Sequence, residues 1–207
     1  MVKINFKLII FWILNIFLLT GCSFDPVKMP LVHQYTLSVV NTKQYSKTSP
    51  NKTILVTLPT AAPAFQSKNM WYSKEPYQIQ SFSYNEWVAA PNNMLLPLLV
   101  ESLTSSHYFK AVVSPPYSGI SYYRLDTQIL DFRQYFFDKN SEFRFVLHAT
   151  LVNENTHNVI FSRDFSAMIK AAANPESGVI AANQAVQQVL NQLVSVISKL
   201  RNYVPLQ

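Results

Sequence analysis

The chain has 207 residues, of which 49% are hydrophobic and 14% are charged, and its formal net charge is +6. Residues 1–21 hold two lysines and no acidic residue, so the 186 residues from position 22 onward carry 15 basic and 11 acidic side chains, a net charge of +4. This excess is mild and scattered, which argues against a nucleic-acid-binding protein. A length of 186 residues suits one domain with a sizeable core.

The first 22 residues have the features of a bacterial lipoprotein signal peptide. Lys3 and Lys7 precede the uncharged run 8–19, and Gly21 and Cys22 follow it. Because a membrane-spanning helix needs about 20 apolar residues, this shorter run predicts a cleaved signal rather than a permanent span. Cys22 is the only cysteine of the chain, so it can form no intrachain disulfide. We expect residues 1–21 to be removed and Cys22 to carry lipid; the alternative is a buried, small apolar residue.

Residues 22–31 are expected to form a tether, and residues 32–207 the folded domain. The tether contains Pro26 and Pro30, shows no periodic pattern, and can reach at most about 30 Å. Neither Ser23 nor Phe24 resembles the aspartate that retains such proteins in an inner membrane. The predicted location is therefore the outer membrane, with the lipid-anchored domain facing the periplasm.

The first half of the domain reads as short strands. Tyr35, Leu37 and Val39 alternate with polar residues, a period of two that is typical of a strand with one buried face. β-Branched residues before Pro59 predict a second strand, and Lys74-Glu75-Pro76 suits a hairpin turn. In chain order, the expected segments are a strand at 32–40, a loop at 41–51, a strand at 53–58, an irregular segment at 61–67, and short strands at 70–73 and 77–82.

A helix is expected to begin near Pro91. Its apolar residues recur at spacings of three, four and seven and share one face: Trp87, Met94, Leu95, Leu98, Leu99 and Leu103. Pro97 fits a helix interior badly, because it removes a hydrogen bond, so we expect a kink or a start displaced toward it. A strand at 109–113 follows and ends before Pro115.

Three longer strands are expected at 122–136, 141–152 and 159–169, forming an antiparallel meander. In the first, the apolar phase changes near 129–131, from Ile129 to Leu130 and Phe132, which predicts a β-bulge. The other two strands each present one apolar face, formed by Phe143, Phe145, Leu147, Ala149 and Leu151 in one and by Val159, Phe161, Phe165 and Ala167 in the other.

The last predicted element is a long amphipathic helix. Asn174-Pro175-Glu176 supplies a capping side chain, a proline for the first position and a carboxylate for the first turn, and Lys199 lies near the far end. The polar face carries amides and almost no charge: Asn183, Gln184, Gln187, Gln188, Asn191 and Gln192. Either this composition arose by chance, or the face packs against a partner. We therefore take Gln184, Gln188 and Asn191 as candidate partner-binding residues.

Aromatic residues gather around the predicted hairpin: Trp71, Tyr72, Tyr77, Phe82, Tyr84 and Trp87. They form either a core cluster or an exposed apolar patch that contacts a partner or lipid. We take Trp71, Tyr72 and Tyr77 as further candidate partner-binding residues. Lys43, Lys47 and Lys52 are interpreted either as a solvated loop or as a surface attracted to anionic lipid.

No catalytic or metal-binding motif emerges. The four histidines have no i,i+4 pair, and no second cysteine can complete a zinc site. The candidate carboxylates Asp126, Asp131, Asp138 and Glu142 are expected to be solvated or structural. The three glycines belong to no phosphate-binding loop. We therefore expect no enzyme activity, no catalytic residue, no metal and no cofactor.

Seven short motifs follow one another between about His33 and Leu200. They include Val56-Thr57-Leu58-Pro59, Trp87-x-x-x-Pro91, Met94-Leu95 with Leu98-Leu99, Phe109-x-Ala111-Val112-Val113, Tyr123-Arg124-Leu125 with Phe132-Arg133-Gln134, Ala149-Thr150-Leu151-Val152, and Phe161-Ser162-Arg163-Asp164-Phe165. This order resembles the family of ABC-type transport auxiliary lipoproteins, which includes paraquat-inducible protein C.

The resemblance implies an α+β domain in which an antiparallel or mixed sheet carries two main helices on one side. It also implies a docking lipoprotein of a lipid transport system that comprises an MCE-domain protein, an ABC permease and an ATPase. Only Cys22 transfers with a defined role, as the lipid attachment site. A homo-oligomer is possible, and the alternative function is a structural or assembly lipoprotein of another envelope complex.

Overall fold

The computed structural model describes residues 30–38, 49–137 and 139–199. The predicted signal peptide, Cys22, most of the predicted tether (22–29), Val39, Lys43, Lys47 and Asp138 lie outside these ranges. The fold described below belongs to the compact unit Val32–Gln207.

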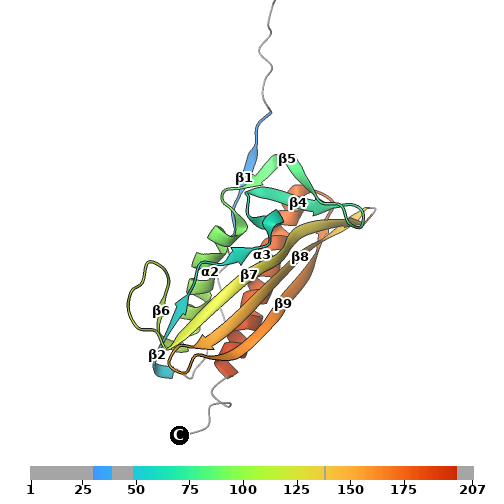
Figure 1. The fold of residues 1–207 in the computed structure, drawn as a ribbon. Helices are drawn as coiled ribbons and strands as arrows, with labels where there is room; N and C mark the ends of the chain where they lie inside the picture. The colour runs from blue at the N-terminus through green and yellow to red at the C-terminus, as the bar shows by residue number, and fades with distance from the viewer. Residues whose placement is uncertain (1–29, 39–48, 138, 200–207) are drawn as a thin grey trace, which may run out of the picture. The chain divides into compact units, whose positions relative to one another are not determined.

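The unit is an α+β domain built around a nine-stranded mixed sheet that does not close on itself (Figure 1). Its elements, in chain order, are β1 (His33–Tyr35), β2 (Ser49–Val56), β3 (Thr60–Ala61), the 3₁₀ turn η1 (Pro63–Phe65), β4 (Asn69–Ser73), β5 (Gln80–Trp87), α2 (Pro91–Ser105), β6 (Phe109–Val113), β7 (Tyr123–Phe137), β8 (Asn140–Asn153), β9 (Asn158–Ala172) and α3 (Pro175–Lys199).

Strand β7 is the centre of the sheet. Along one side it pairs with β8, and β8 pairs with β9, which gives the predicted antiparallel meander. Along its other side β7 pairs in parallel with three short strands in succession, β2, β3 and β4. Strand β6 extends the sheet beyond β2, whereas β5 and β1 extend it beyond β4. The sheet is therefore mixed, because the chain runs along β7 in short parallel steps before it forms the meander.

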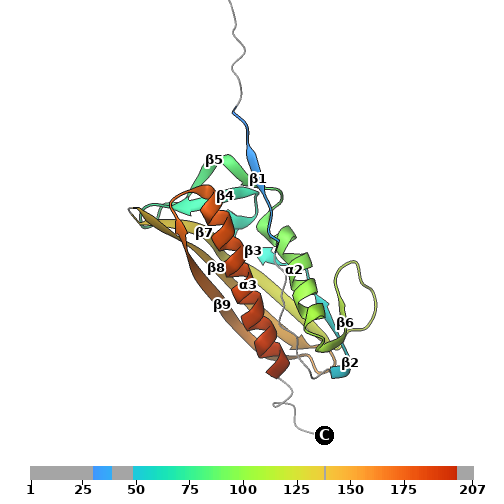
Figure 2. The same ribbon diagram turned by 180° about the vertical axis from the view of Figure 1, so that it is seen from behind.

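Both helices cover the same face of the sheet (Figure 2). Helix α3 packs on β7, β8 and β9, and α2 packs mainly on β6. The predicted inward face of β8, from Phe143 to Leu151 in steps of two, is buried. The predicted apolar face of α2 is buried as well, and Trp87, at the end of β5, is only 1% exposed.

Helix α3 begins as the sequence predicts. The Oδ1 atom of Asn174 accepts a hydrogen bond from the backbone N–H of Ser177 at 2.8 Å, which satisfies one of the free donors of the first turn. Glu176 lies in the first turn and Lys199 in the last, where each charge opposes the end of the helix dipole. These features fix the start of α3 and stabilise both of its ends.

Helix α2 excludes one of the two outcomes expected at Pro97, a displaced start. It begins at Pro91 and runs without interruption through Pro97 to Ser105, so the start is not displaced toward the second proline. The side chain of Pro97 is exposed, whereas its neighbours Leu95, Leu98 and Leu99 are buried. Packing of this apolar face outweighs the hydrogen bond that Pro97 cannot donate.

The bulge predicted in β7 is confirmed, because the register with β8 shifts between Ile129 and Asp131. The sequence places Leu130 on the same apolar face as Phe132, and this part of the prediction is wrong, since Leu130 is the extra residue of the bulge and is 37% exposed. The prediction that Val159 shares the apolar face of Phe161 is wrong for a similar reason. A second register shift opposite Val152 separates Val159 from the phase of Phe161 and leaves it 59% exposed.

The strand boundaries in the first half need correction. Strand β1 has only three residues, and Leu37 is buried without belonging to a strand. Strand β2 begins at Ser49, inside the predicted loop. Strand β5 begins at Gln80, because the turn after β4 continues beyond Pro76.

Candidate docking surfaces

The amide side chains of α3 line an open groove beside β9. The groove has a volume of about 540 Å³, and six of its seven lining residues come from α3; together with Ile169 they are Gln184, Gln187, Gln188, Asn191, Gln192 and Ser195. We call this surface the amide groove. It contains Gln184, Gln188 and Asn191, the three candidates predicted on this helix.

Asn183 does not belong to the amide groove, although the sequence places it on the same polar face. Its Oδ1 atom accepts a hydrogen bond from the backbone N–H of Ser38 at 2.7 Å, and its Nδ2 atom donates to the carbonyl of Val179 at 2.9 Å. Asn183 therefore holds the segment after β1 against α3. Its role is structural.

One edge of β9 adjoins the amide groove. Within the described ranges β9 pairs with β8 alone, so a 15-residue strand has one edge without a strand partner. The Nε2 atom of Gln192 donates to the carbonyl of Ser166 at 3.2 Å, which joins α3 to β9 beside this edge. A rigid helix and an open strand edge together offer hydrogen-bonding groups without net charge.

The aromatic residues around the β4–β5 hairpin divide between core and surface, so neither sequence interpretation holds for all of them. Trp87 is buried and Trp71 is half-buried against the core, whereas Tyr84 is 52% exposed and Tyr77 is fully exposed. Tyr72 is half-buried and contacts other rings. Of the three predicted candidates, only Tyr77 is thus fully available to a partner.

The turn between β4 and β5 faces the end of β7 across a hollow of about 540 Å³. Residues 73–79 line one side, and Arg133 with residues 135–137 lines the other. We call this region, residues 72–82 and 133–137, the hairpin end. Tyr77 and Phe137 therefore line the same hollow, an arrangement that sequence reasoning missed because it depends on the parallel pairing of β4 with β7.

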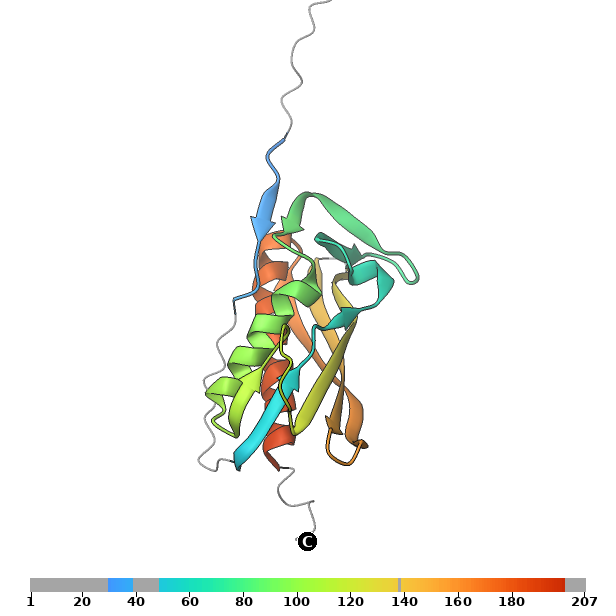
Figure 3. The ribbon, with the colours of Figure 1, turned by 60° about the vertical axis from the view of Figure 1, so that its left-hand side comes forward.

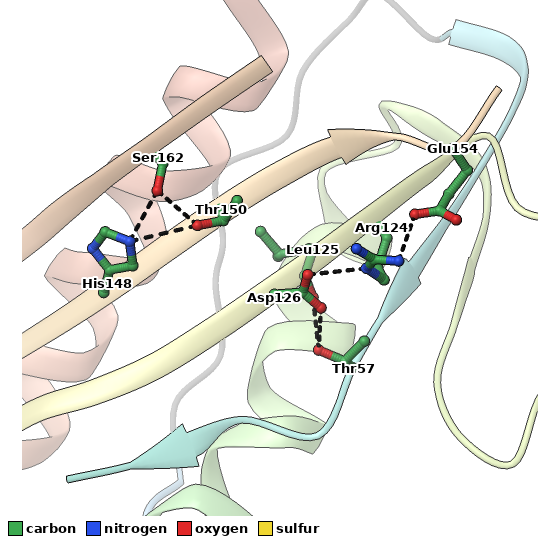
Figure 4. Close-up of polar contacts among 8 residues, drawn as sticks. All are labelled: Thr57, Arg124, Leu125, Asp126, His148, Thr150, Glu154 and Ser162. Atoms are coloured by element: carbon green, nitrogen blue, oxygen red, sulfur yellow. Dashed lines mark hydrogen bonds and ion pairs between the residues drawn. The ribbon is translucent and has the colours of Figure 1, made fainter. Parts of the chain in front are cut away.

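The face of the sheet away from the helices carries ion pairs (Figure 4). Arg124 contacts Asp126 at 2.9 Å and Glu154 at 2.8 Å, and the hydroxyl of Thr57 donates to Asp126 at 2.9 Å. The predicted carboxylate Asp126 therefore ties β7 to the segment after β2. Its role is structural, as the sequence indicates.

Asp131, beside the bulge, is also held by cations. It lies 3.0 Å from Arg133 and 3.7 Å from Arg144, and it accepts a hydrogen bond from the hydroxyl of Tyr135 at 2.7 Å. Burial, together with this hydrogen bond to Asp131, raises the pKa of Tyr135 above its usual value. Asp131 therefore does not pair with a second carboxylate for acid–base chemistry. Glu142, the remaining described candidate, lies opposite Tyr135 on β8.

A serine, a histidine and an aspartate lie side by side on the same open face, a cluster that sequence reasoning missed. The Nδ1 atom of His148 is 2.6 Å from Asp164, and its Nε2 atom is 3.0 Å from the hydroxyl of Ser162. The hydroxyl of Thr150 lies 2.8 Å from that of Ser162 (Figure 4). The cluster follows from the pairing of β8 with β9, which places His148 opposite Asp164.

These contacts have the connectivity of a nucleophile, a base and an orienting acid. The side chain of Asp164 is 56% exposed and that of His148 is 36% exposed, so water screens their interaction. Activation of a serine needs an enclosed site with hydrogen-bond donors for the developing oxyanion. Ser162 and Asp164 are exposed and His148 and Thr150 are half-buried, so we interpret the cluster as a surface hydrogen-bond network.

The described residues contain no group of three histidine, cysteine, aspartate or glutamate side chains that could hold a metal ion. Across the same part of the chain, none of the helices has the length and apolarity required to span a bilayer.

Comparison with known proteins identifies the family. The family model for the ABC-type transport auxiliary lipoprotein component matches residues 35–194, and the chain therefore belongs to this family. The resemblance drawn from the sequence motifs is confirmed. The family indicates that the protein is anchored to a membrane of the cell envelope.

Solved structures share the fold. Protein XCC0632 from Xanthomonas campestris, described as a member of DUF330, has a TM-score of 0.73 and 22% identity, over 82% of this chain and 98% of that one. An uncharacterized protein has a TM-score of 0.64 and 16% identity, over 81% of this chain and 99% of that one. No curated protein matches the chain.

Proposed function

We propose that the protein is a lipoprotein of the outer membrane, acylated at Cys22 and facing the periplasm, that serves an MCE-type ABC lipid transport system by docking rather than by catalysis. The observation that carries the proposal is the match to the transport auxiliary family over residues 35–194. It is supported by residues 1–22, which have the sequence features of a lipoprotein signal. The proposed partners are an MCE-domain protein, the permease and the ATPase.

The amide groove supports a docking role. Its side chains come from one long helix whose opposite face is buried in the core, so the groove is held on a rigid element. Neutral amides can donate and accept hydrogen bonds with any polypeptide backbone, and they lose less hydration than charges when a partner covers them. Confinement of the domain to one membrane surface raises its effective concentration for a partner that reaches that surface.

The proposal can be tested by replacing Gln188 with a photoreactive phenylalanine analogue in cells that express an MCE-type ABC transport system. Gln128, an exposed glutamine on the opposite face of the sheet, provides the matched control position. We expect ultraviolet light to link position 188 to the MCE-domain protein and position 128 to give much less of this adduct.

Adducts that contain only components of another envelope complex would contradict the transport proposal and favour the structural or assembly role. An adduct with a second copy of the chain would assign the amide groove to a homo-oligomer and would deprive the transport proposal of this docking surface.

A further inference from the structure

The hairpin end exposes large apolar side chains from two neighbouring turns. Tyr77 is fully exposed, Phe137 is 57% exposed and Ile79 is 38% exposed. Tyr77 and Ile79 belong to the turn after β4, and Phe137 ends β7, which pairs with β4. Side chains of this kind are usually exposed singly, whereas a group of them marks a contact site.

The group is supported by packed aromatic rings. The ring centroids of Tyr72 and Phe82 are 4.5 Å apart, and that of Phe136 lies 5.5 Å from Tyr72 and 6.2 Å from Phe82. These three rings pack β4, β5 and β7 together, so the exposed side chains project from a packed aromatic cluster.

The turn itself is held in one conformation. The hydroxyl of Ser73 donates to the carbonyl of Gln78 at 2.7 Å, and the Nε2 atom of Gln78 donates to Glu75 at 2.9 Å. Tyr77 has a φ of 66°, a left-handed conformation that is strained for a bulky side chain. Such strain persists where the surroundings impose it, and it is concentrated at functional sites.

The hairpin end lies at the same end of the domain as β1, where the described chain begins (Figures 1 and 3). His33 of β1 pairs with Asn85 of β5, and β5 leads back to the hairpin turn at Gln80. Five residues of extended chain separate Asn85 from Gln80, a distance of about 17 Å. The tether of residues 22–31 spans at most about 30 Å. An acyl group on Cys22 would therefore keep the hairpin end within reach of the same membrane.

We propose that the hairpin end is a membrane-contacting surface, which rests on the bilayer that holds the acyl chains and orients the domain there. This inference rests on the acylation in the proposed function. Tyrosine suits such a position because its ring contacts the apolar region while its hydroxyl remains in the hydrated headgroups. Lys74 and Glu75 carry opposite charges in the turn, and Arg133 is paired with Asp131 at 3.0 Å, so the contact does not require anionic lipid.

This orientation would leave other surfaces available. The amide groove runs along α3 rather than across the hairpin end, so contact with the bilayer does not cover it. The acyl chains would supply attachment, and the hairpin end would fix which faces of the domain a partner meets.

The test uses the mature acylated protein on phosphatidylcholine vesicles. Because Cys22 is the only native cysteine and its sulfur would be acylated, a Lys74→Cys variant can carry one polarity-sensitive fluorophore in the hairpin turn with Tyr77 intact. The matched control is Ile120→Cys, since Ile120 is 90% exposed and lies in the loop between β6 and β7. We expect a blue shift of emission at position 74 on adding vesicles and none at position 120. Addition of Tyr77→Ser to the Lys74→Cys variant should reduce the shift.

Flotation of the same samples separates the two proposals. Protein that floats with the vesicles without a blue shift at position 74 would overturn the membrane contact and leave the anchor intact. Equal shifts at positions 74 and 120, or a shift at 74 only when envelope proteins are added, would overturn it as well. Protein that does not float would contradict the anchor and, with it, both proposals.

Discussion

At the scale of single residues, Gln134 is the centre of the junction between α3 and the sheet. It is only 1% exposed, and its Nε2 atom donates to the hydroxyl of Ser141 at 2.6 Å and to the carbonyls of Ala172 and Asn174 at 3.2 Å each. A Cβ atom added to Gly178 would clash with the side-chain amide of Gln134. Glycine is therefore required at position 178 because α3 approaches Gln134 of β7 closely. It is not required by the backbone conformation, since the φ of Gly178 is not positive.

Gly178→Ala should lower the free energy of unfolding by about 1–3 kcal/mol, because Gln134 can move aside only by losing its hydrogen bonds. Helix propensity alone predicts the opposite sign, a gain of about 0.5–1 kcal/mol. Chemical denaturation measures the difference, with Ile180→Ala on the exposed side of the helix as the control. A stabilised Gly178→Ala variant would show that the junction is looser than the distances indicate.

Tyr135 should contribute to the pH dependence of stability. Its pKa is raised in the folded protein by burial and by the hydrogen bond to Asp131, so above about pH 10 the folded state holds a proton that the unfolded state loses. The stabilisation is thus complete below about pH 10 and is lost as the pH rises through the folded-state pKa. Denaturation between pH 8 and pH 11 should show Tyr135→Phe less stable than the wild type at pH 8, with a smaller difference at pH 11. A difference that is independent of pH would contradict this account, and Tyr84→Phe, at an exposed site, serves as control.

At the scale of elements, the spacing of apolar residues predicted the meander, the bulge and both helices, and the capping residues predicted the start of α3. These features depend on residues close together in the chain, as in the cap formed by Asn174. The sequence analysis erred where pairing between distant segments decides the structure. The sequence pattern could not show that β2, β3 and β4 pair successively with β7, and hence it could not show that Tyr77 and Phe137 line one hollow. The sequence could group the amide residues of α3 because helical periodicity alone places them on one face, and their role as partner-binding residues stays a prediction. It could not show that Asn183 makes a long-range hydrogen bond with Ser38 instead of lining the amide groove.

Pro97→Ala should stabilise the protein. The exposed proline cannot donate the hydrogen bond that an interior helical residue provides, and an alanine there would supply it without disturbing the buried face of α2. We expect the free energy of unfolding to rise by about 1–3 kcal/mol, less the benefit that proline gives by restricting the unfolded chain. Thermal and chemical unfolding should agree, and Glu101→Ala, exposed one turn later, should change stability by less than about 0.5 kcal/mol. A destabilised Pro97→Ala variant would mean that α2 depends on the shape of the proline ring.

At the scale of the whole molecule, the proposed function combines a compact domain with an attachment site outside it. Cys22→Ser should therefore leave the free energy of unfolding of the domain unchanged and move the protein from the membrane fraction to the soluble fraction. Cell fractionation checks the location, and denaturation of the purified protein checks the fold. Retention of the Cys22→Ser protein in the outer membrane would show that something other than acyl chains holds it there.

The most direct measurement is the intact mass of the protein isolated from membranes after growth with a palmitate analogue. The account predicts a chain that begins at Cys22 and carries labelled acyl groups on its N-terminal residue. An unlabelled chain that still begins at Met1 would contradict the lipoprotein assignment and, with it, the proposed role in lipid transport.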